Sequence, residues 1–559
     1  MTGHQQPDNR RRGTGIADTD KRVAWTAVLS VLALALVYVI LAGVFTHPLF
    51  LNAGESTPSG SFSGDQCQTI WFFWWMKTAL FELHTSPFWT DAIYYPYGTG
   101  LGHHLCPFTN LIAIAAAGIL GEPISSPLVY NSLLVLSFAL TGLGAFFLIR
   151  HFVHDRGAAF VASLFVVFSP ARLWHLDHLN LLSIGWGLWA VYFAVRYLKK
   201  PRLVSLMIAV VFTVIAFYSD LTCAMLAMLF LVAYVLLSAK AIWNDRDRSR
   251  LIGGAVAGMV VAALCILPGL LSLQSDDVEW HVNWQDTEAY SADVLDLVVP
   301  WSQAAATGPG EAYAGLLLLI IACGTSVFCR DSVRRPWAIM AAIFLFISLG
   351  PTLQIGGHKF LRGLMPERWL FEIVPYLNMS RSPVRFMILA QLCLAVMAAQ
   401  GVSAWLQSAR EWSGRIWSRA IPVITVLAVT LLLVWEYNAG GIGLTSMTVP
   451  DVYGEIAADP SIKVICDLPV SDKLQIGNWY MYWQTIHGRK AVNGYLTRPS
   501  KSAHTLTDRI KEWRDYGPER MQELRDAGID AVVYHDPKQE SRLIRLNGDG
   551  VSGQPLKDE

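Results

Sequence analysis

The sequence predicts an all-α polytopic membrane bundle of about eleven transmembrane helices, followed by a small extracytoplasmic α/β domain. Composition is the first reason: of 559 residues, 53% are hydrophobic and only 15% are charged, and the mean hydropathy is +0.39. A soluble protein of this size would carry more charge. The second reason is that long apolar segments recur along most of the chain. The third is that charge rises and the apolar segments shorten after about Asn438.

Each predicted span is an apolar segment close to the ~17–25 residues that cross a bilayer. The spans are 24–46, 128–149, 157–170, 179–198, 203–218, 221–239, 251–273, 312–329, 336–355, 384–406 and 421–437. The first is too long for a signal-peptide core and lacks a small-x-small cleavage site, so we interpret it as an uncleaved signal anchor. Residues 1–22, which include three consecutive arginines, are predicted to be a disordered cytoplasmic N-terminus.

Basic residues in the loops predict the orientation. They cluster in alternate loops, at His151–Arg156, Lys199–Arg202, Lys240–Arg250, Arg330–Arg335 and Arg410–Arg419. Positively charged loops stay in the cytoplasm, so the N-terminus is predicted inside and the tail outside a cell membrane, inner or plasma. The transmembrane domain then covers 23–437 with a long first outer loop, 47–127, and the extracytoplasmic domain covers 438–559 with a disordered end. Segment 108–120 has only ~13 apolar residues and is predicted not to span, the alternative being a short tilted span.

Charge balance and absent motifs remove several classes of function. Lys+Arg and Asp+Glu are both 43, so the sequence predicts no basic surface and therefore no nucleic-acid partner. No Walker, GxGxxG, HExxH or GxSxG motif occurs in a suitable context, which argues against ATP-driven transport, dinucleotide enzymes and common hydrolases. The eight cysteines lack zinc-ligand spacing. Cys67 and Cys106 share the first outer loop, where a disulfide can form, and the sequence leaves bonded and free thiols open.

The first outer loop carries the residues most suggestive of chemistry. Gly64-Asp65-Gln66 is followed by the aromatic run Trp71–Trp75 and by the Pro/Gly/Tyr segment Tyr94–Gly98. A carboxylate at the mouth of a bundle, beside aromatic rings at the lipid surface, suits chemistry on a lipid-linked substrate. Asp65 could also cap the following helix, with Gln68 completing a capping box. The aromatic run could be an interfacial anchor or a substrate platform.

A second group of polar residues follows Pro170. Arg172, His175 and His178 are spaced by three, which places them on one side of a helical turn. Three cationic groups at a membrane surface suit a phosphate or pyrophosphate, and Arg172 would add bidentate contacts, although it could also snorkel at the interface. Asp177 with the two histidines could bind a metal, but in a helical turn it would point away. We therefore assign no metal ligand and predict no certain cofactor, and a divalent metal stays open.

Four further ionisable residues are predicted to bind substrate: Asp91, Asp220, Arg381 and Arg385. All four lie on the predicted outer side, Asp91 in the first loop and the other three at or near the end of a span. Ionisable groups at membrane depth are costly, so they face a cavity or a partner more often than lipid. Asp220 could instead terminate a helix.

The tail predicts strands and short helices. Lys463–Pro469 and the residues after Gly528 are expected to be strands, and Thr507–Trp513 and Pro518–Ala527 short helices. The segment Tyr482–Arg489 could bind sugar or pack between domains.

The chain resembles a known group of membrane enzymes. Three stretches are similar to bacterial membrane proteins of the YfhO-like group: Ser169-Pro170-Ala171-Arg172 with His175 and His178, Ser348-Leu349-Gly350-Pro351, and Arg381-Ser382-Pro383-Val384-Arg385-Phe386. The tail pieces Val449–Tyr453 and Cys466–Pro469 also fit. The order of one span, an acidic first loop, a bundle and an outer domain resembles the GT-C superfamily, glycosyltransferases that use polyprenyl-phosphate-linked sugars. Many members carry a second acidic residue where this chain has Gln66.

The resemblance implies a mechanism and partners. Asp65 would be the general base for an acceptor hydroxyl that attacks the anomeric carbon, with inversion. Arg172, His175 and His178, with Arg381 or Arg385, would hold the leaving lipid phosphate. The partners would be a polyprenyl-phosphate sugar donor, membrane lipid and an envelope glycan, lipid or protein acceptor. The rival functions are a transporter or flippase for a lipid-linked glycan, a non-catalytic envelope assembly protein, and a ligase that moves whole glycans between lipids.

Overall fold

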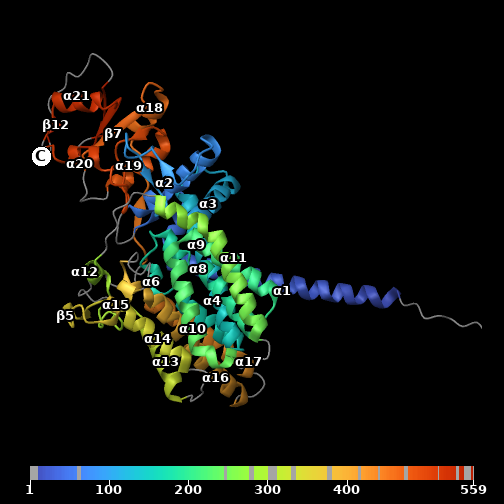
Figure 1. The fold of residues 1–559 in the computed structure, drawn as a ribbon. Helices are drawn as coiled ribbons and strands as arrows, with labels where there is room; N and C mark the ends of the chain where they lie inside the picture. The colour runs from blue at the N-terminus through green and yellow to red at the C-terminus, as the bar shows by residue number, and fades with distance from the viewer. Residues whose placement is uncertain are drawn as a thin grey trace, which may run out of the picture.

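The structure is a computed structural model, and Figure 1 shows its course from the N-terminus in blue to the C-terminus in red. It describes residues 10–59, 64–243, 248–275, 283–299, 311–328, 335–373, 381–412, 417–437, 441–470, 476–513, 515–536, 540–546 and 556–557. Residues 1–9 and most of the chain after 546, which the sequence predicts to be disordered, lie outside this description. The structure confirms the fold class, a helical membrane bundle followed by a small α/β domain.

Long apolar helices form the bundle. They are α1 (Arg10–Phe45), α4 (Pro127–Phe152), α5 (Arg156–Val167), α7 (Leu179–Leu182) and α8 (Ile184–Lys199), α9 (Leu203–Ser219), α10 (Leu221–Trp243), α11 (Arg248–Ser275), α13 (Leu316–Phe328), α14 (Arg335–Ser348), α16 (Met387–Trp412) and α17 (Trp417–Tyr437). Every predicted span coincides with one of these helices or with two in succession. In the described residues, seven helices are long and apolar enough to cross a membrane. The helices α5, α9, α13 and α14 are apolar but shorter.

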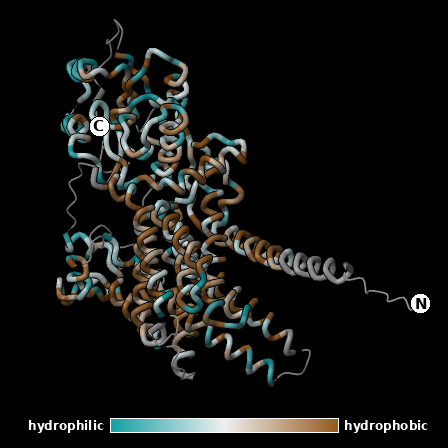
Figure 2. The backbone as a smooth tube through the Cα atoms, turned by 45° about the vertical axis from the view of Figure 1, so that its right-hand side comes forward, coloured by the Kyte–Doolittle hydropathy of each residue, from teal (hydrophilic) through white to brown (hydrophobic). Residues whose placement is uncertain are grey.

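Small residues let the bundle helices approach closely. A Cβ added to Gly142 of α4 would lie 2.6 Å from the ring atoms of Tyr38, so α1 packs directly on the α4 backbone. The Tyr38 hydroxyl is 2.5 Å from the Ser163 hydroxyl on α5, which satisfies both buried groups. At the centre lies α16, which packs against α5, α13, α14 and α17. Figure 2 shows the apolar residues concentrated in this bundle.

The first loop and the segment between α11 and α16 add short elements at the ends of the bundle. The first loop contains η1 (Leu49–Leu51), β1 (Ser56–Pro58), α2 (Asp65–Lys77), η2 (Thr78–Glu82), β2 (Trp89–Thr90), β3 (Thr99–Gly100) and α3 (Pro107–Leu120). The others are α6 (Pro170–Leu173), α12 (Trp284–Thr287), η3 (Glu288–Tyr290), β4 (Leu353–Ile355), β5 (His358–Phe360), α15 (Pro366–Ile373) and η6 (Pro383–Phe386). The helix α3 is the segment predicted not to span, and it is shorter than a typical span.

The C-terminal domain is built on a four-stranded sheet. Its elements are β6 (Leu444–Ser446), α18 (Val452–Ala458), β7 (Val464–Leu468), α19 (Ile476–His487), β8 (Lys490–Ala491), α20 (Thr505–Lys511), β9 (Asp515–Tyr516), α21 (Pro518–Asp526), β10 (Ala531–Tyr534), β11 (Arg542–Arg545) and β12 (Leu556–Lys557). The strand order is β11-β10-β7-β8, with β7 parallel to both neighbours and β11 antiparallel. The predicted strands and the two predicted short helices are present.

The first loop is part of the C-terminal domain structurally, although some 400 residues separate them in the sequence. β1 pairs with β6. The backbone N–H of Ala491 donates to Ala92 O at 2.8 Å, and that of Tyr95 donates to Ala491 O at 3.0 Å, which covers the edge of β8. The helix α2 packs on α19, and Trp71 Nε1 donates to Gln484 Oε1 at 2.7 Å. Figure 1 shows α2 and α3 beside this domain.

This packing overturns the interpretation of the aromatic run. Trp71, Phe72 and Trp75 pack in the core between the first loop and the C-terminal domain, and Phe73 packs in the bundle core, so the run is neither an anchor in lipid nor a platform at the lipid surface. For the segment from Tyr482, which belongs to α19, the structure supports the packing alternative, since Gln484 is fully buried and donates to Ala92 O.

The structure also bears on two expectations for the first loop and the N-terminus. Of the two alternatives for Cys67 and Cys106, it has free thiols: the first packs in the bundle core, and the second lines a cavity beyond α2, so they face different environments. The helix α1 begins at Arg10, within the segment predicted to be disordered. Arginine is a good helix former, and no proline interrupts the chain between Arg10 and Phe45, so the span continues backwards as helix.

We predict that Gly142→Ala destabilises the protein by about 1–3 kcal/mol, because its methyl group would enter the Tyr38 ring. Gly118→Ala in α3 is the matched control, since nothing lies within 4 Å of its added Cβ. Alanine is the better helix former, so this control should keep or raise stability. The measurement is the thermal unfolding midpoint of both variants in one detergent. Equal midpoints would contradict the close packing of α1 on α4.

Candidate active site

A cavity of about 540 Å³ lies where the bundle, the first loop and the C-terminal domain meet. Its charged lining residues are Asp65, Asp177, His178, Asp220, Arg381, Arg385 and Arg498. Apolar lining residues come from the ends of three bundle helices: Phe217 of α9, Leu221 and Met225 of α10, and Leu273 of α11. The cavity therefore has a charged part and an apolar part that is continuous with the bundle.

Asp65 is the first residue of α2, and its carboxylate enters the cavity. Gly64 precedes it with φ of +125°, a conformation that favours glycine, and an added Cβ would lie 3.0 Å from Asn478 Nδ2. The capping interpretation is wrong, because Gly64 is the N-cap and no side chain caps the helix. Gln68 instead donates to Tyr495 O at 2.6 Å. Asp65 Oδ1 has only a long contact, 3.5 Å, with Asn478 Nδ2, which leaves it open to the cavity.

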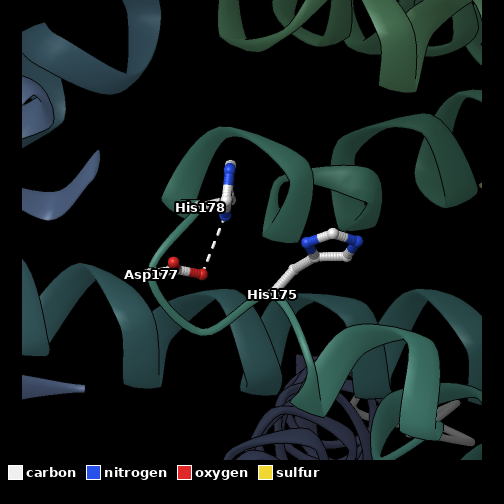
Figure 3. A group of neighbouring side chains, drawn as sticks. All are labelled: His175, Asp177 and His178. Atoms are coloured by element: carbon white, nitrogen blue, oxygen red, sulfur yellow. Dashed lines mark hydrogen bonds and ion pairs between the residues drawn. The ribbon is translucent and has the colours of Figure 1, made fainter. Parts of the chain in front are cut away.

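His178 joins Asp65 to the bundle. Its Nε2 lies 2.7 Å from Asp65 Oδ2, and its Nδ1 lies 2.8 Å from Asp177 Oδ1. Figure 3 shows the bond to Asp177 and the ring of His175 nearby. The prediction that Asp177 points away from His178 is wrong, because α6 ends at Leu173 and the following residues form turns rather than helix. A single imidazole thus lies between two carboxylates.

The environment of His178 favours its charged form. Burial alone lowers the pKa of the imidazole, but the hydrogen bonds and negative charges of Asp177 and Asp65 outweigh burial and raise the pKa from 6.5 to about 10. Both ring nitrogens then donate, as the two short distances require. His178 is therefore a cation at neutral pH and compensates the two carboxylates.

The same group offers ligand atoms for a metal ion. His175, Asp177 and His178 each offer one ligand atom, and these atoms lie within 4.8 Å of one another. His175 Nδ1 and Asp177 Oδ2 are buried and have no hydrogen-bond partner among the described residues. A metal would need a third ligand from His178 or Asp65, and His178 would have to give up a proton to supply it. The donor set fits a divalent ion such as zinc, which would supply Lewis-acid polarisation.

Three arginines form the cationic part of the cavity. Arg385 lies in η6, Arg381 lies just before η6, and Arg498 lies in the segment after β8. Burial, together with the charges of Arg381 and Arg385, lowers the pKa of Arg498 to about 10. No carboxylate of the described residues forms an ion pair with Arg381 or Arg385, and Arg385 Nε is buried without a partner. Such a group suits an anion with several oxygens.

Asp220 is held at the border of the cavity. Its Oδ1 accepts from Cys223 N at 2.6 Å at the start of α10, and its Oδ2 accepts from Asn180 Nδ2 at 2.9 Å. Asp220 is the C-cap of α9, so it does terminate a helix, as its alternative interpretation holds, and it also lines the cavity.

Three predicted site residues lie elsewhere. Arg172 is 1% exposed and outside the cavity lining; its Nη1 donates to Thr141 Oγ1 at 2.6 Å, and the guanidinium faces the Phe138 ring. His175 lies behind His178, with Nε2 2.8 Å from Glu311 Oε1. Asp91 forms an ion pair with Lys490 outside the cavity. The prediction that Arg172, His175 and His178 share one side of a helical turn is wrong, because the turn ends before His175.

Sequence reasoning missed Arg498, Asn180 and Glu311. Arg498 follows the segment Asn493-Gly494-Tyr495, and no local pattern connects it with Asp65. Only the packing of the first loop on the C-terminal domain places it at the cavity, where its carbonyl oxygen lies 3.3 Å from His104 Nε2.

We predict that His178→Gln lowers stability by about 3 kcal/mol at neutral pH, because two buried carboxylates lose their cation. Because folding raises the pKa of His178, its charge stabilises the folded state fully at pH values below 6.5, the pKa of the unfolded state. This contribution to stability is lost as the pH rises through about 10, the pKa in the folded state. The difference in unfolding midpoint between wild type and variant should thus shrink above pH 9. His358→Gln, at an exposed strand, is the control. A difference that does not depend on pH would contradict the cationic state of His178.

Solved structures share this fold. ArnT from Cupriavidus metallidurans bound to undecaprenyl phosphate aligns with a TM-score of 0.50 and 14% identity over 95% of this chain and 99% of that one. Its apo form aligns with a TM-score of 0.47 and 13% identity over 94% of this chain and 98% of that one. The Archaeoglobus fulgidus oligosaccharyltransferase, in complex with Zn and sulfate, aligns with a TM-score of 0.47 and 12% identity over 90% of this chain and 67% of that one. The likeness to ArnT confirms the predicted GT-C-like fold.

The family to which the chain belongs follows from a direct match. No curated protein matches the sequence. The resemblance to the YfhO-like group stays a prediction. Residues 66–390, more than half of the chain, match the family described as "Domain of unknown function (DUF6311)", and the chain belongs to that family.

Proposed function

We propose that the protein is a membrane glycosyltransferase of GT-C type that moves a sugar from a polyprenyl-phosphate donor to an envelope glycan, lipid or protein acceptor on the outer side of the membrane. The observation that carries the proposal is the cavity itself. It combines a carboxylate with one open oxygen, Asp65, and a group of three arginines, at the end of an apolar bundle. A donor of this class needs both an anion site and an apolar channel.

The arginines are the site for the donor phosphate. Arg385 and Arg381 lack carboxylate partners in the described residues, and Arg498 lines the same cavity. Guanidinium groups bind phosphate oxygens in pairs, and they offset the charge that develops on a leaving phosphate. ArnT, which has this fold, is bound to undecaprenyl phosphate in one of its structures, and this supports the donor class.

The prenyl chain follows the apolar part of the cavity. Phe217, Leu221, Met225 and Leu273 line that part and belong to α9, α10 and α11. Residues of the same helices are exposed and apolar, among them Met207, Val211 and Leu264, so the cavity adjoins the surface that faces lipid. Phe72 of the aromatic run of α2 also lines the cavity, whereas Trp71, Phe73 and Trp75 are buried in the core.

Asp65 is the general base of the proposed reaction. The acceptor oxygen forms a bond to the anomeric carbon, the bond from that carbon to the phosphate oxygen breaks, and the acceptor proton passes to Asp65 Oδ1. The electron pair of the broken bond stays on the lipid phosphate at the arginines. One displacement inverts the anomeric carbon. His178 positions Asp65, because its Nε2 lies 2.7 Å from Asp65 Oδ2.

The first test compares two carboxylates of the same loop. Asp65→Asn should reduce sugar transfer by at least about a hundredfold, since general bases contribute factors of ~10²–10⁴. Asp91→Asn is the matched control and should retain activity, because Asp91 lies outside the cavity and pairs with Lys490. The measurement is transfer of labelled sugar from a panel of polyprenyl-phosphate donors in membranes containing each protein. Full activity of Asp65→Asn would refute the general base. Absence of transfer by the wild type from every donor would favour a transporter or an assembly protein.

The second test concerns the phosphate. Arg385→Gln should raise the KM for the lipid donor by about tenfold or more, since a bidentate, charge-assisted contact is lost. Arg520→Gln on α21 is the control, because this arginine contacts only Trp513 and Glu523 and lies outside the cavity. An unchanged donor KM for Arg385→Gln, at normal expression, would remove this arginine from the phosphate site.

A further inference from the structure

A second, smaller cavity adjoins the first. It has a volume of about 270 Å³ and lies among the start of α19, the segment after β8, and α20. Arg381, Tyr495 and Thr497 line both cavities, so the two are neighbours that share a wall. Besides the shared Arg381, the second cavity is lined by Lys511 of α20, which does not line the first cavity.

The sheet places this cavity where open α/β sheets bind ligands. The chain runs from β7 through α19 to β8 on one side, and returns through α20 and α21 to β10 on the other side of β7. Ile465 and Val533 pack on the face of α18 and α19, whereas Cys466 and Val532 pack on the face of α20 and α21. The connections therefore lie on opposite faces, and the carboxyl end of β7 is the topological switch point. A crevice forms there and is the usual ligand site of such sheets.

The floor of the crevice is fixed by one side chain. Asp467 N donates to Asn493 Oδ1 at 2.6 Å, and Asn493 Nδ2 donates to Asp467 O at 2.8 Å. These bonds continue the pairing of β7 with β8 beyond Ala491. Asn493 is 3% exposed and lines the cavity, and Val470, just past β7, lines it as well. The cavity is thus built on the ends of two strands.

The lining charges favour an anion. Arg381 and Lys511 are cationic, and none of the described lining residues is an aspartate or a glutamate. Ile476 and Gly477, in the first turn of α19, form another part of the wall, and the N-terminus of a helix carries partial positive charge. Lys511 Nζ is 3.0 Å from Asp508 Oδ1, a contact of the i,i+3 type that leaves the site a net cation.

We propose that this second cavity, at the switch point of the C-terminal sheet, binds the phosphate or carboxylate group of the acceptor. The role of acceptor site rests on the proposed function, whereas the binding of an anion does not. Arg381 is shared by both cavities, so an acceptor held by its anionic group at Lys511 would lie next to the donor site. The acceptor hydroxyl that reacts would then extend toward Asp65. The anionic group can belong to a lipid headgroup or to a soluble molecule.

The experiment measures binding separately from transfer. Full-length protein in a neutral detergent is titrated calorimetrically with inorganic phosphate and with dihexanoyl phosphatidic acid, in an Arg385→Gln background that weakens the first cavity. Lys511→Gln should weaken binding about tenfold, as expected for one charge-assisted contact. Lys463→Gln is the matched control, because Lys463 lies at the amino end of β7 and is exposed. Lys511→Glu, a second variant at this accessible position, should weaken binding further.

The two probes separate the sources of the anion. If phosphatidic acid binds more tightly than phosphate and Lys511→Gln removes this binding, the anion is a lipid headgroup. If both probes bind equally, the anion is a soluble molecule. Either outcome supports the site. Binding that Lys511→Gln and Lys463→Gln affect alike overturns it. In transfer assays with otherwise wild-type protein, Lys511→Gln should raise the acceptor KM about tenfold and leave the donor KM unchanged. Absence of transfer by the wild type would refute the proposed function alone, because the binding experiment still decides on the anion site.

Discussion

The need to compensate buried negative charge determines how the parts of this protein meet. Asp65 and Asp177 come from segments more than 100 residues apart, and His178 lies between them with a raised pKa. Removing water from two carboxylates is costly unless a cation is hydrogen-bonded to both. The charged imidazole satisfies that condition, and it holds α2 against the end of the bundle. The cavity is a consequence of this contact.

The first loop completes the C-terminal domain rather than extending along the lipid surface. Its aromatic residues fill the space between α2 and α19, and its backbone covers the edge of β8. Burial of several large rings contributes much more than exposed rings at an interface would. Because the loop also connects to α1 and α4, the C-terminal domain is fixed on the bundle, and residues such as Arg498 keep their place over the membrane helices.

The site combines groups of both charges in a way that suits transfer chemistry. Asp65, Asp177 and His178 meet at the start of α2. The arginines come from η6, the residues before it and the segment after β8, and Asp220 at the end of α9 lines the same cavity. Arg381 lines both cavities and joins the donor phosphate to the acceptor anion in the proposed scheme. The fold alone does not imply a reaction, and the proposal therefore depends on these groups rather than on the likeness to ArnT.

The sequence by itself determined the elements that depend on local pattern. Apolar length located the bundle helices. Short apolar runs next to Pro or Gly located β7 and β10, and the spacing of charged and apolar residues located α20 and α21. It also singled out Asp65, His178, Asp220, Arg381 and Arg385, because ionisable residues beside spans are rare. Only the tertiary structure decided which of these meet: it placed Arg172 and Asp91 outside the cavity and Arg498 inside it. Contacts between segments hundreds of residues apart depend on packing across the whole chain, which no local spacing records.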